Sequence, residues 1–248
     1  MIVTEVLPAT LSTVDVAPSG REPGTGRAWL ASRYHRTEAS YVRLNMITSL
    51  TGSASGSDGT SETLTSPIDR AILGTIRRDA DVVLVGAQTV RQEGYVIPRT
   101  ARLAIVTTTG DLKGHRLEAE GSGRVFLVCP AEHVARVRAR ATTLGATVIA
   151  VEARAEGDSG AALDPRDILT ALAAHGMHRV VVEGGPSLAA QFAAARAIDE
   201  YCVTVAPLIE PADAPFIAVT AASRPATEVA GMLVDAAGFS YLRLRALT

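Results

Sequence analysis

Short apolar runs rich in Val, Ile and Leu recur from residue 41 onward, and stretches with the helical period lie between them. Such runs are typical of strands that are buried on both faces of a sheet. We predict strands at 41–47, 82–85, 103–106, 124–128, 147–151, 179–182 and 200–205, and helices at 67–78, near Gln88, and at 132–143, 165–175 and 186–195. The alternation predicts βαβ units and an α/β fold: a three-layer α/β/α arrangement around a mostly parallel, twisted sheet.

Two of the predicted helices carry their own start signals. Ser66-Pro67 and Asp164-Pro165 each place an oxygen-bearing cap residue directly before a proline at the first helical position. Gly176 suits the left-handed position that ends the second of these helices. The signals therefore predict both helix starts and one helix end.

The last part of the chain has a different pattern. Two apolar runs, at 226–234 and 241–247, flank a short connection that contains Gly238. This spacing is typical of a β-hairpin. We predict a C-terminal antiparallel hairpin at the edge of the sheet.

The first forty residues are rich in Pro, Gly, Ser and Thr. Their loosest part is 20–26, and Trp29 is their one large apolar anchor. We therefore predict an irregular N-terminal arm, 1–40, that lies over the core, followed by one domain at 41–248.

The composition argues against several classes of partner. The 24 basic and 26 acidic residues leave a formal net charge of -2, which gives no general attraction to nucleic acid or to an anionic membrane. The sequence shows no apolar stretch of about 18 residues and no charged segment followed by a signal core, so we expect a cytoplasmic protein. Cys129 and Cys202 lie inside apolar runs, where a thiol usually acts as a small buried hydrophobe.

Common catalytic motifs are absent from the sequence. It contains no G-x-G-x-x-G between a strand and a helix, no G-x-x-x-x-G-K-[ST] loop and no G-x-S-x-G elbow. The five histidines form no H-E-x-x-H pair, and two cysteines cannot build a metal site, so no metal is expected. We set aside ordinary Rossmann, P-loop, serine hydrolase and metal-dependent hydrolase chemistry.

Three loops with small and hydroxyl-bearing residues follow predicted strands, at 48–66, 86–91 and 183–188. Ligands of open α/β sheets bind outside the carboxyl ends of strands, so these loops are placed to converge on one ligand. In the last loop, two glycines let the backbone come close to a ligand, and a Pro-Ser pair opens a helix whose free N–H groups favour a pyrophosphate.

The other two loops support the same interpretation. Gly86 followed by Thr89 offers a similar arrangement after a neighbouring strand, and Thr107-Thr108 follow a third strand. Each loop alone is equally consistent with a tight strand-to-helix turn. The three together indicate a shared anionic cofactor.

Three polar residues near these loops have two interpretations each. Glu183 ends an apolar strand, where a buried carboxylate needs either an arginine partner or the N–H groups of a ligand, and we favour the ligand. Arg77, near a helix end, either pairs with a phosphate or is solvated beside Arg78. Asn45, the only asparagine, either contacts a heterocycle or makes a structural hydrogen bond.

Five segments, taken in order, resemble the reductase domain of bifunctional riboflavin biosynthesis proteins and their stand-alone relatives. They are YVRLN at 41–45, SLTG at 49–52, LTSP at 64–67, VVLVGAQTVR at 82–91 and VEGGPSL at 182–188. The resemblance implies a dihydrofolate-reductase-like fold, a homodimer, and NADPH-dependent reduction of 5-amino-6-(5-phosphoribosylamino)uracil to the ribitylamino product. In that reaction the opened ribose, as its Schiff base, receives a hydride at C1′.

The resemblance also implies the site residues. Those implied to hold NADPH are Ile47, Thr63, Gly86, Thr89, Val90, Glu93, Thr107, Thr108, Gly184, Gly185, Pro186, Ser187 and Leu188. Those implied to meet the ribosylaminopyrimidine phosphate are Ser61, Arg77, Glu183 and a residue of the loop 97–100, for which we choose Arg99. Asn45 is added as a substrate candidate from its place on the strand. Thr107-Thr108 stand where the family binds the 2′-phosphate, which implies NADPH rather than NADH.

The chain departs from the family's pattern at Thr51, where the family usually has Asp. A hydroxyl cannot deliver a proton with the pKa of a carboxylate, so the proton donor is left open between Asp58 in the same loop and water. The catalytic candidates are Thr51, Asp58 and Glu183. The H-x-E and P-C-x-x-C signature of the zinc deaminase half is absent, so we expect a stand-alone reductase.

Two other functions stay open. The first is a dihydrofolate-type pterin reductase, because both substrates are flat, amide-bearing heterocycles that Glu183 or Asn45 could bind. The second is a protein that binds NADPH without turnover, which the hydroxyl at Thr51 would suit.

Overall fold

The computed structural model describes all residues except 9, 17–24, 116, 118–122, 156–160, 213, 214, 222 and 248. The strands are β1 (Ile2–Leu7), β2 (Thr13–Asp15), β3 (Tyr41–Ser49), β4 (Val82–Gly86), β5 (Arg102–Val106), β6 (Val125–Pro130), β7 (Thr147–Val151), β8 (Ala153–Ala155), β9 (Ala161–Leu163), β10 (Arg179–Val182), β11 (Glu200–Ala206), β12 (Thr227–Asp235) and β13 (Ser240–Ala246). The helices are α1 (Thr25–Tyr34), α2 (Pro67–Arg78), α3 (Ala87–Gln92), α4 (Val134–Leu144), α5 (Pro165–Ala173) and α6 (Pro186–Ala194), with a 3₁₀ turn, η1 (Ala131–His133), before α4.

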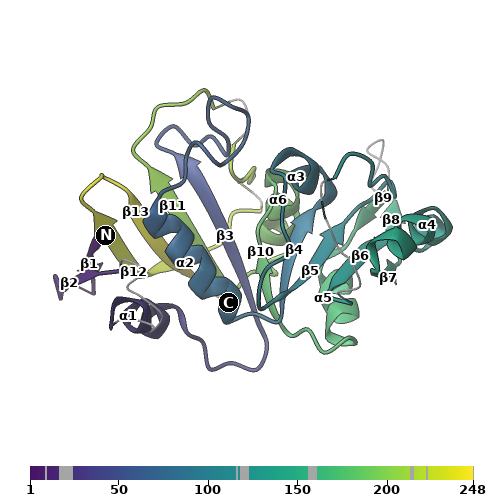
Figure 1. Ribbon diagram of the computed structural model, residues 1–248, viewed down its shortest axis with the longest axis horizontal. Coiled ribbons are helices and arrows are strands. Elements are labelled where there is room, and N and C mark those ends of the chain that lie inside the picture. The colour runs from purple at the N-terminus through teal and green to yellow at the C-terminus, as the bar shows by residue number, and fades with distance from the viewer. Residues whose placement is uncertain are drawn as a thin grey trace.

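Within the described residues, eleven strands form one sheet in the order β2-β1-β12-β13-β11-β3-β10-β4-β5-β6-β7 (Figure 1). From β11 to β7 all neighbouring strands are parallel, whereas β13, β12, β1 and β2 are added to β11 in antiparallel fashion. The predicted mostly parallel α/β sheet is confirmed. Its parallel part brings the carboxyl ends of β3, β10, β4 and β5 to one edge, where ligands of such sheets bind.

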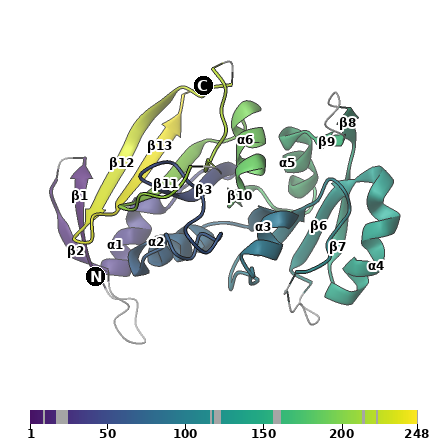
Figure 2. The same ribbon diagram turned by 90° about the horizontal axis from the view of Figure 1, so that it is seen from above.

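Helices cover both faces of this sheet. Figure 2 shows α5 and α6 on one side and α1, α2, α3 and α4 on the other. The alternation of side chains along β10 explains the two layers, because successive residues of a strand point to opposite faces. Val180 and Val182 pack in the cluster that contains Phe192 of α6, whereas Val181 packs in the cluster that contains Ile72 of α2.

Many helices and strands lie where the sequence predicts them. The predicted bounds of the helix at 67–78 and of the strands at 147–151 and 179–182 agree with those of α2, β7 and β10. Ser66 caps α2 by accepting a hydrogen bond from the backbone N–H of Asp69, and Asp164 caps α5 in the same way through Arg166. Gly176 has the predicted left-handed φ, 68°.

The prediction that residues 1–40 are irregular is wrong. β1, β2 and α1 lie there, and β1 pairs with β12 inside the main sheet. The physical reason is that buried and more exposed residues alternate along Ile2–Leu7, as in a strand with one covered face. This strand pairs with residues near the other end of the chain, for example Val3 with Asp235. Leu30 and Tyr34 are the fully buried anchors of α1, whereas Trp29 is only partly buried. Most of the segment 20–26 lies outside the described residues.

The C-terminal hairpin is confirmed, but its predicted place at the sheet edge is wrong. β12 and β13 pair through Val234 and Ser240, and β13 pairs with β11 on its other side. Because β1 and β2 extend the sheet beyond β12, the hairpin lies inside the sheet rather than at its margin.

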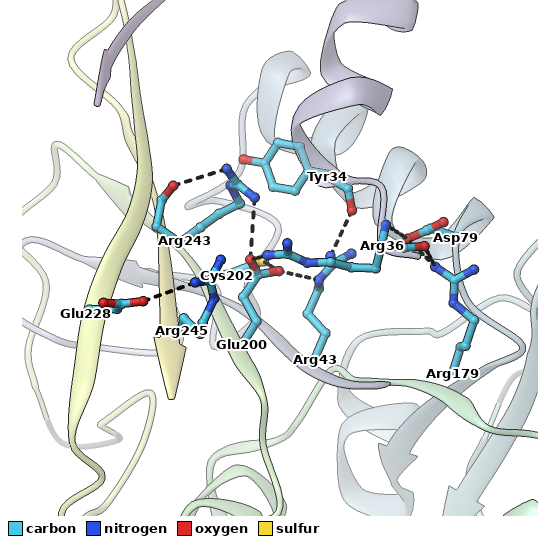
Figure 3. A network of polar contacts seen from close by, with 11 residues as sticks. Tyr34, Arg36, Arg43, Asp79, Arg179, Glu200, Cys202, Glu228, Arg243 and Arg245 are labelled. Carbon is cyan, nitrogen blue, oxygen red and sulfur yellow. Dashed lines mark hydrogen bonds and ion pairs between the residues drawn. The ribbon is translucent and has the colours of Figure 1, made fainter. Parts of the chain in front are cut away.

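A buried network of charged side chains holds the end of α1 against the sheet (Figure 3). Glu200, at the start of β11, has a fully buried side chain that accepts hydrogen bonds from Arg36 and from Arg43 Nε, the latter at 2.8 Å. Arg243 Nη1 of β13 lies 3.5 Å from the same carboxylate. Arg43 also donates to the backbone carbonyl of Tyr34, the last residue of α1. The network therefore joins α1 to β3, β11 and β13.

Cys129 and Cys202 are both free and buried, as expected. Burial raises the pKa of both thiols, and the carboxylate of Glu200 raises that of Cys202 further. Among the described residues, no helix has the length and apolar character needed to cross a membrane.

Candidate active site

A cavity of about 1020 Å³ opens where β3, β4, β5 and β10 end, between α2, α3 and α6. The predicted residues that line it are Asn45, Ile47, Ser61, Arg77, Gly86, Thr89, Glu93, Thr107, Thr108, Glu183, Gly185, Pro186, Ser187 and Leu188. These residues come from segments that are far apart in the sequence. The three loops identified from the sequence therefore meet at one cavity.

Six predicted site residues do not line this cavity. The hydroxyl of Thr51 contacts Ser49 and the backbone of Glu210, and Asp58 is exposed and accepts hydrogen bonds from Thr60 and Thr63. These bonds hold the pKa of the Asp58 carboxyl below its usual value.

The other residues outside the cavity lining are Val90, which is buried in the core against β4 and β5, Arg99, which is exposed, Gly184, and Thr63. Their proposed roles stay predictions.

The glycine loop after β10 lies tightly against the loop after β4. The backbone N–H of Gly86 donates to the carbonyl of Gly184 at 2.8 Å. A Cβ on Gly185 would come within 2.7 Å of Thr89 Oγ1, so only glycine fits there without a shift. Gly185 is the N-cap residue of α6 and Pro186 its first residue, so the free N–H groups at this helix start lie at the cavity. This surface suits the pyrophosphate of a dinucleotide.

Glu183 is paired with an arginine, which is the interpretation that we did not favour. Arg77 Nε donates to Oε1 at 2.8 Å and Arg77 Nη2 to Oε2 at 2.6 Å, and Tyr95 donates its hydroxyl to Oε2. Although burial alone would lower the pKa of Arg77, the carboxylate of Glu183 raises it overall, and burial together with Glu183 raises the pKa of Tyr95. The pair forms because the end of β10 faces the last turn of α2.

Ser61 and Glu93 also contact each other. The backbone N–H and the hydroxyl of Ser61 both donate to the Glu93 carboxylate, at 3.0 Å and 2.9 Å. This contact closes the loop after β3 against the end of α3. A residue predicted for substrate and one predicted for cofactor are thus neighbours at the cavity.

Asp69 lines the cavity and was missed by the sequence analysis. Its Oδ1 accepts the hydroxyl of Thr204 at 2.6 Å, and its Oδ2 accepts the hydroxyl of Thr65 at 2.7 Å. An acidic residue in the first turn of a helix is ordinary, so nothing in the sequence marked it. Only the packing of α2 against β11 turns this carboxylate toward a ligand cavity.

We expect Asp69→Asn to raise the melting temperature at about pH 7 and to leave it unchanged at about pH 3. Burial raises the pKa of Asp69 and outweighs the hydrogen bonds from Thr204 and Thr65, which lower it. The stabilising contribution of the protonated form is complete below the unfolded-state pKa of about 3.9 and is lost as pH rises through the higher folded-state pKa. Asn carries no charge at any of these pH values, so the variant does not lose the stability that the wild-type protein loses when Asp69 ionises. A melting series across pH measures the difference, and equal melting temperatures at neutral pH would contradict it.

Among the described residues, no group of three or more His, Cys, Asp or Glu side chains could hold a metal ion. The cavity is lined by hydroxyls, backbone N–H groups, arginines and carboxylates. These groups bind nucleotides and polar heterocycles.

The mostly parallel sheet with helices on both faces is an α/β fold of the dihydrofolate-reductase-like type. The dihydrofolate reductase of Enterococcus faecalis superposes with a TM-score of 0.50 at 10% identity, over 84% of this chain and 97% of that enzyme. The chain belongs to the family described as the RibD C-terminal domain, whose model matches residues 40–215.

Two further proteins are similar to this chain, one in sequence and one in fold. The riboflavin biosynthesis protein RibD of Mycobacterium tuberculosis is 30% identical over 191 residues, which cover 75% of this chain and 47% of that protein. A pyrimidine reductase-like protein from Corynebacterium diphtheriae superposes with a TM-score of 0.70 at 21% identity, over 84% of this chain and 92% of that one. The chain spans about half the length of the curated relatives it matches.

Proposed function

We propose that the chain is an NADPH-dependent reductase that converts 5-amino-6-(5-phosphoribosylamino)uracil to its ribitylamino product. The observation that carries the proposal is that one cavity is lined both by the glycine loop with the start of α6 and by the Arg77–Glu183 pair. Membership of the RibD C-terminal domain family supports it. We further propose that the protein acts in the cytoplasm as a homodimer.

The residues at the cavity fit a nicotinamide dinucleotide. The tight approach of Gly185 to Thr89 leaves bare backbone at the cavity wall, which a pyrophosphate needs. Gly185, Pro186 and Ser187 at the start of α6 would hold the pyrophosphate. Thr107 and Thr108, at the end of β5, would hold the adenosine end. The nicotinamide, when bound, supplies the hydride for C1′ of the opened ribose.

The chain's own residues bind and orient the pyrimidine. Glu183 already accepts three hydrogen bonds from Arg77 and Tyr95, so this pair acts as one rigid unit. Within the described residues Arg77 Nη1 has no protein partner, and it would receive a phosphate oxygen. Asn45, from β3, and Ser61, from the loop after it, would bind the pyrimidine and the ribityl chain. Holding two reactants in a reactive orientation lowers the barrier by removing much of the entropy cost of bringing them together.

NADPH oxidation by the purified protein, with the pyrimidine phosphate and dihydrofolate tested side by side, is the direct test. We expect turnover of the pyrimidine, and Arg77→Gln to raise its KM about tenfold or more, because a charge-assisted contact to phosphate is lost. Arg78→Ala is the matched control, since Arg78 is exposed and lies outside the cavity lining. Tight NADPH binding without turnover of either compound would favour the non-catalytic function.

Pterin reduction is the second candidate, and the placement of Asp69 favours it. A partly buried carboxylate held by Thr204 and Thr65 at the cavity suits a heterocycle with adjacent N–H donors. The Enterococcus faecalis dihydrofolate reductase of similar fold is described as a complex with NADP(H). Turnover of dihydrofolate alone in the same assay would select this function and reject the first.

A further inference from the structure

The cavity side of α2 carries a bare stretch of helix between two arginines. Arg70, Leu73, Gly74 and Arg77 all line the cavity, and their spacing of three, four and seven residues places them on one face of the helix. Arg70 and Arg77 are about 10 Å apart along the helix axis, since each residue adds about 1.5 Å. Two long side chains at that separation can contact one small group held between them, over Gly74.

Gly74 calls for an explanation, because glycine in the interior of a helix destabilises it relative to alanine. Gly74 lies in the middle of α2, and its φ is not in the left-handed region that would require glycine. Apart from the helix backbone, a Cβ on Gly74 would meet only Nη1 of Arg78 within 4 Å among the described residues, at 3.7 Å. Neither backbone strain nor close packing accounts for this glycine. What it provides is open space at the cavity wall.

Arg70 is held by one exposed contact. Its Nη2 donates to the carboxylate of Glu62, in the loop after β3, and this is the only hydrogen bond of the Arg70 side chain within the described residues. The two side chains are 56% and 67% exposed. An exposed ion pair of this kind contributes little to stability. Arg70 can therefore exchange Glu62 for another anion at small cost.

The carboxylates near this face differ in how firmly they are held. Glu183 accepts hydrogen bonds from Arg77, and Asp69 accepts two hydroxyl groups of the protein. Glu62 is more exposed than either and is bonded only through Arg70 in the described part of the chain. The cavity lining has more carboxylates than arginines, so an anion binds best where a carboxylate can move away into water. Arg70 and Glu62 meet that condition.

We propose that the phosphate group of the substrate lies over Gly74, between Arg70 and Arg77, and takes the place of Glu62 on Arg70. The inference rests on the proposed reduction of a phosphorylated pyrimidine, and it adds Arg70 and Gly74 as residues that determine specificity for the phosphate. Arg70 offers the forked donors of a guanidinium, and Nη1 of Arg77 offers a further donor from the other side. Glu62 then acts as a competitor of the phosphate.

Two probes measured by calorimetry, without turnover, test this site. They are 5-amino-6-(5-phosphoribitylamino)uracil, which is the proposed product, and the same compound without its phosphate, so the ratio of their dissociation constants measures the contribution of the phosphate. We expect Arg70→Ala to weaken the phosphorylated probe about 10- to 100-fold and to leave the other within about twofold. We expect Glu62→Ala to tighten the phosphorylated probe alone, by about two- to fivefold.

Gly74→Leu tests the open space over the helix. Leucine favours a helix more than glycine does, so the melting temperature should not fall. The phosphorylated probe should nevertheless bind about tenfold or more weakly, because the new side chain occupies the place of the phosphate. A structural defect would instead lower both quantities. Arg138→Ala is the matched control, since Arg138 is an exposed arginine of α4 that does not line the cavity.

Weaker binding of both probes in Arg70→Ala and in Glu62→Ala alike would overturn the inference, because the ion pair would then only hold the loop after β3. An unchanged ratio in Arg70→Ala or in Gly74→Leu would overturn it as well. If the protein binds neither uracil, the proposed reaction fails, and ribose 5-phosphate against ribose then decides the site. A preference for the ester that depends on Arg70 retains the anion site, and no preference rejects it. Competition between ribose 5-phosphate and NADPH would assign the anion to the cofactor and reject the substrate.

Discussion

Replacing Glu200 by Ala is expected to lower the free energy of unfolding by about 3–5 kcal/mol. The Glu200 side chain is fully buried, and three arginines from separate elements, Arg36, Arg43 and Arg243, lie against its carboxylate (Figure 3). Removing the carboxylate leaves their positive charges together in a site with little access to water. The cost arises mainly from these unpaired charges rather than from the lost contacts.

Urea unfolding followed by the fluorescence of Trp29, the single tryptophan, measures this effect. Trp29 lies on α1, the helix that the network holds to the sheet. Glu228→Ala is the matched control: it removes an ion pair with Arg245 in which both side chains are more than half exposed, and it should cost no more than about 1 kcal/mol. Equal losses in the free energy of unfolding in the two variants would contradict the prediction, because burial of Glu200 would then add nothing to the cost.

Replacing Gly185 by Ala is expected to weaken nicotinamide nucleotide binding about 10- to 100-fold. The added Cβ would lie 2.7 Å from Thr89 Oγ1, and a threonine hydroxyl one bond from its own Cβ has little room to move away. Either the loop after β10 or the start of α3 must shift, and both form the cavity wall. The folded state should lose only about 1–3 kcal/mol, because the strain is local.

A double-mutant cycle separates this clash from other effects. Thr89→Ala removes the hydroxyl, so the double variant Gly185→Ala/Thr89→Ala should bind the nucleotide better than the sum of the two single losses predicts. Fluorescence titration with NADPH gives all four affinities. If the losses simply add, the hydroxyl is not what the new Cβ meets, and wild-type affinity in Gly185→Ala would show that this wall does not touch the cofactor.

The elements of the central fold could be predicted because their signals are local. A cap residue followed by proline defines the start of α2, and three consecutive valines define β10, without reference to the rest of the chain. The missed elements were those whose stability comes from distant partners. β1 is a short strand that pairs with β12, and the network around Glu200 fixes α1 beside it.

The same distinction between local and long-range information holds for the candidate site. The sequence by itself determined which loops follow the parallel strands and which of their residues are glycine, hydroxyl-bearing or charged. Both follow from the order of residues along the chain. Only the tertiary structure decided how the polar groups pair: Glu183 with Arg77, 106 residues apart, and Asp69 with Thr204, 135 residues apart. Such pairings depend on which helix packs over which strand end, and no local pattern of residues contains that information.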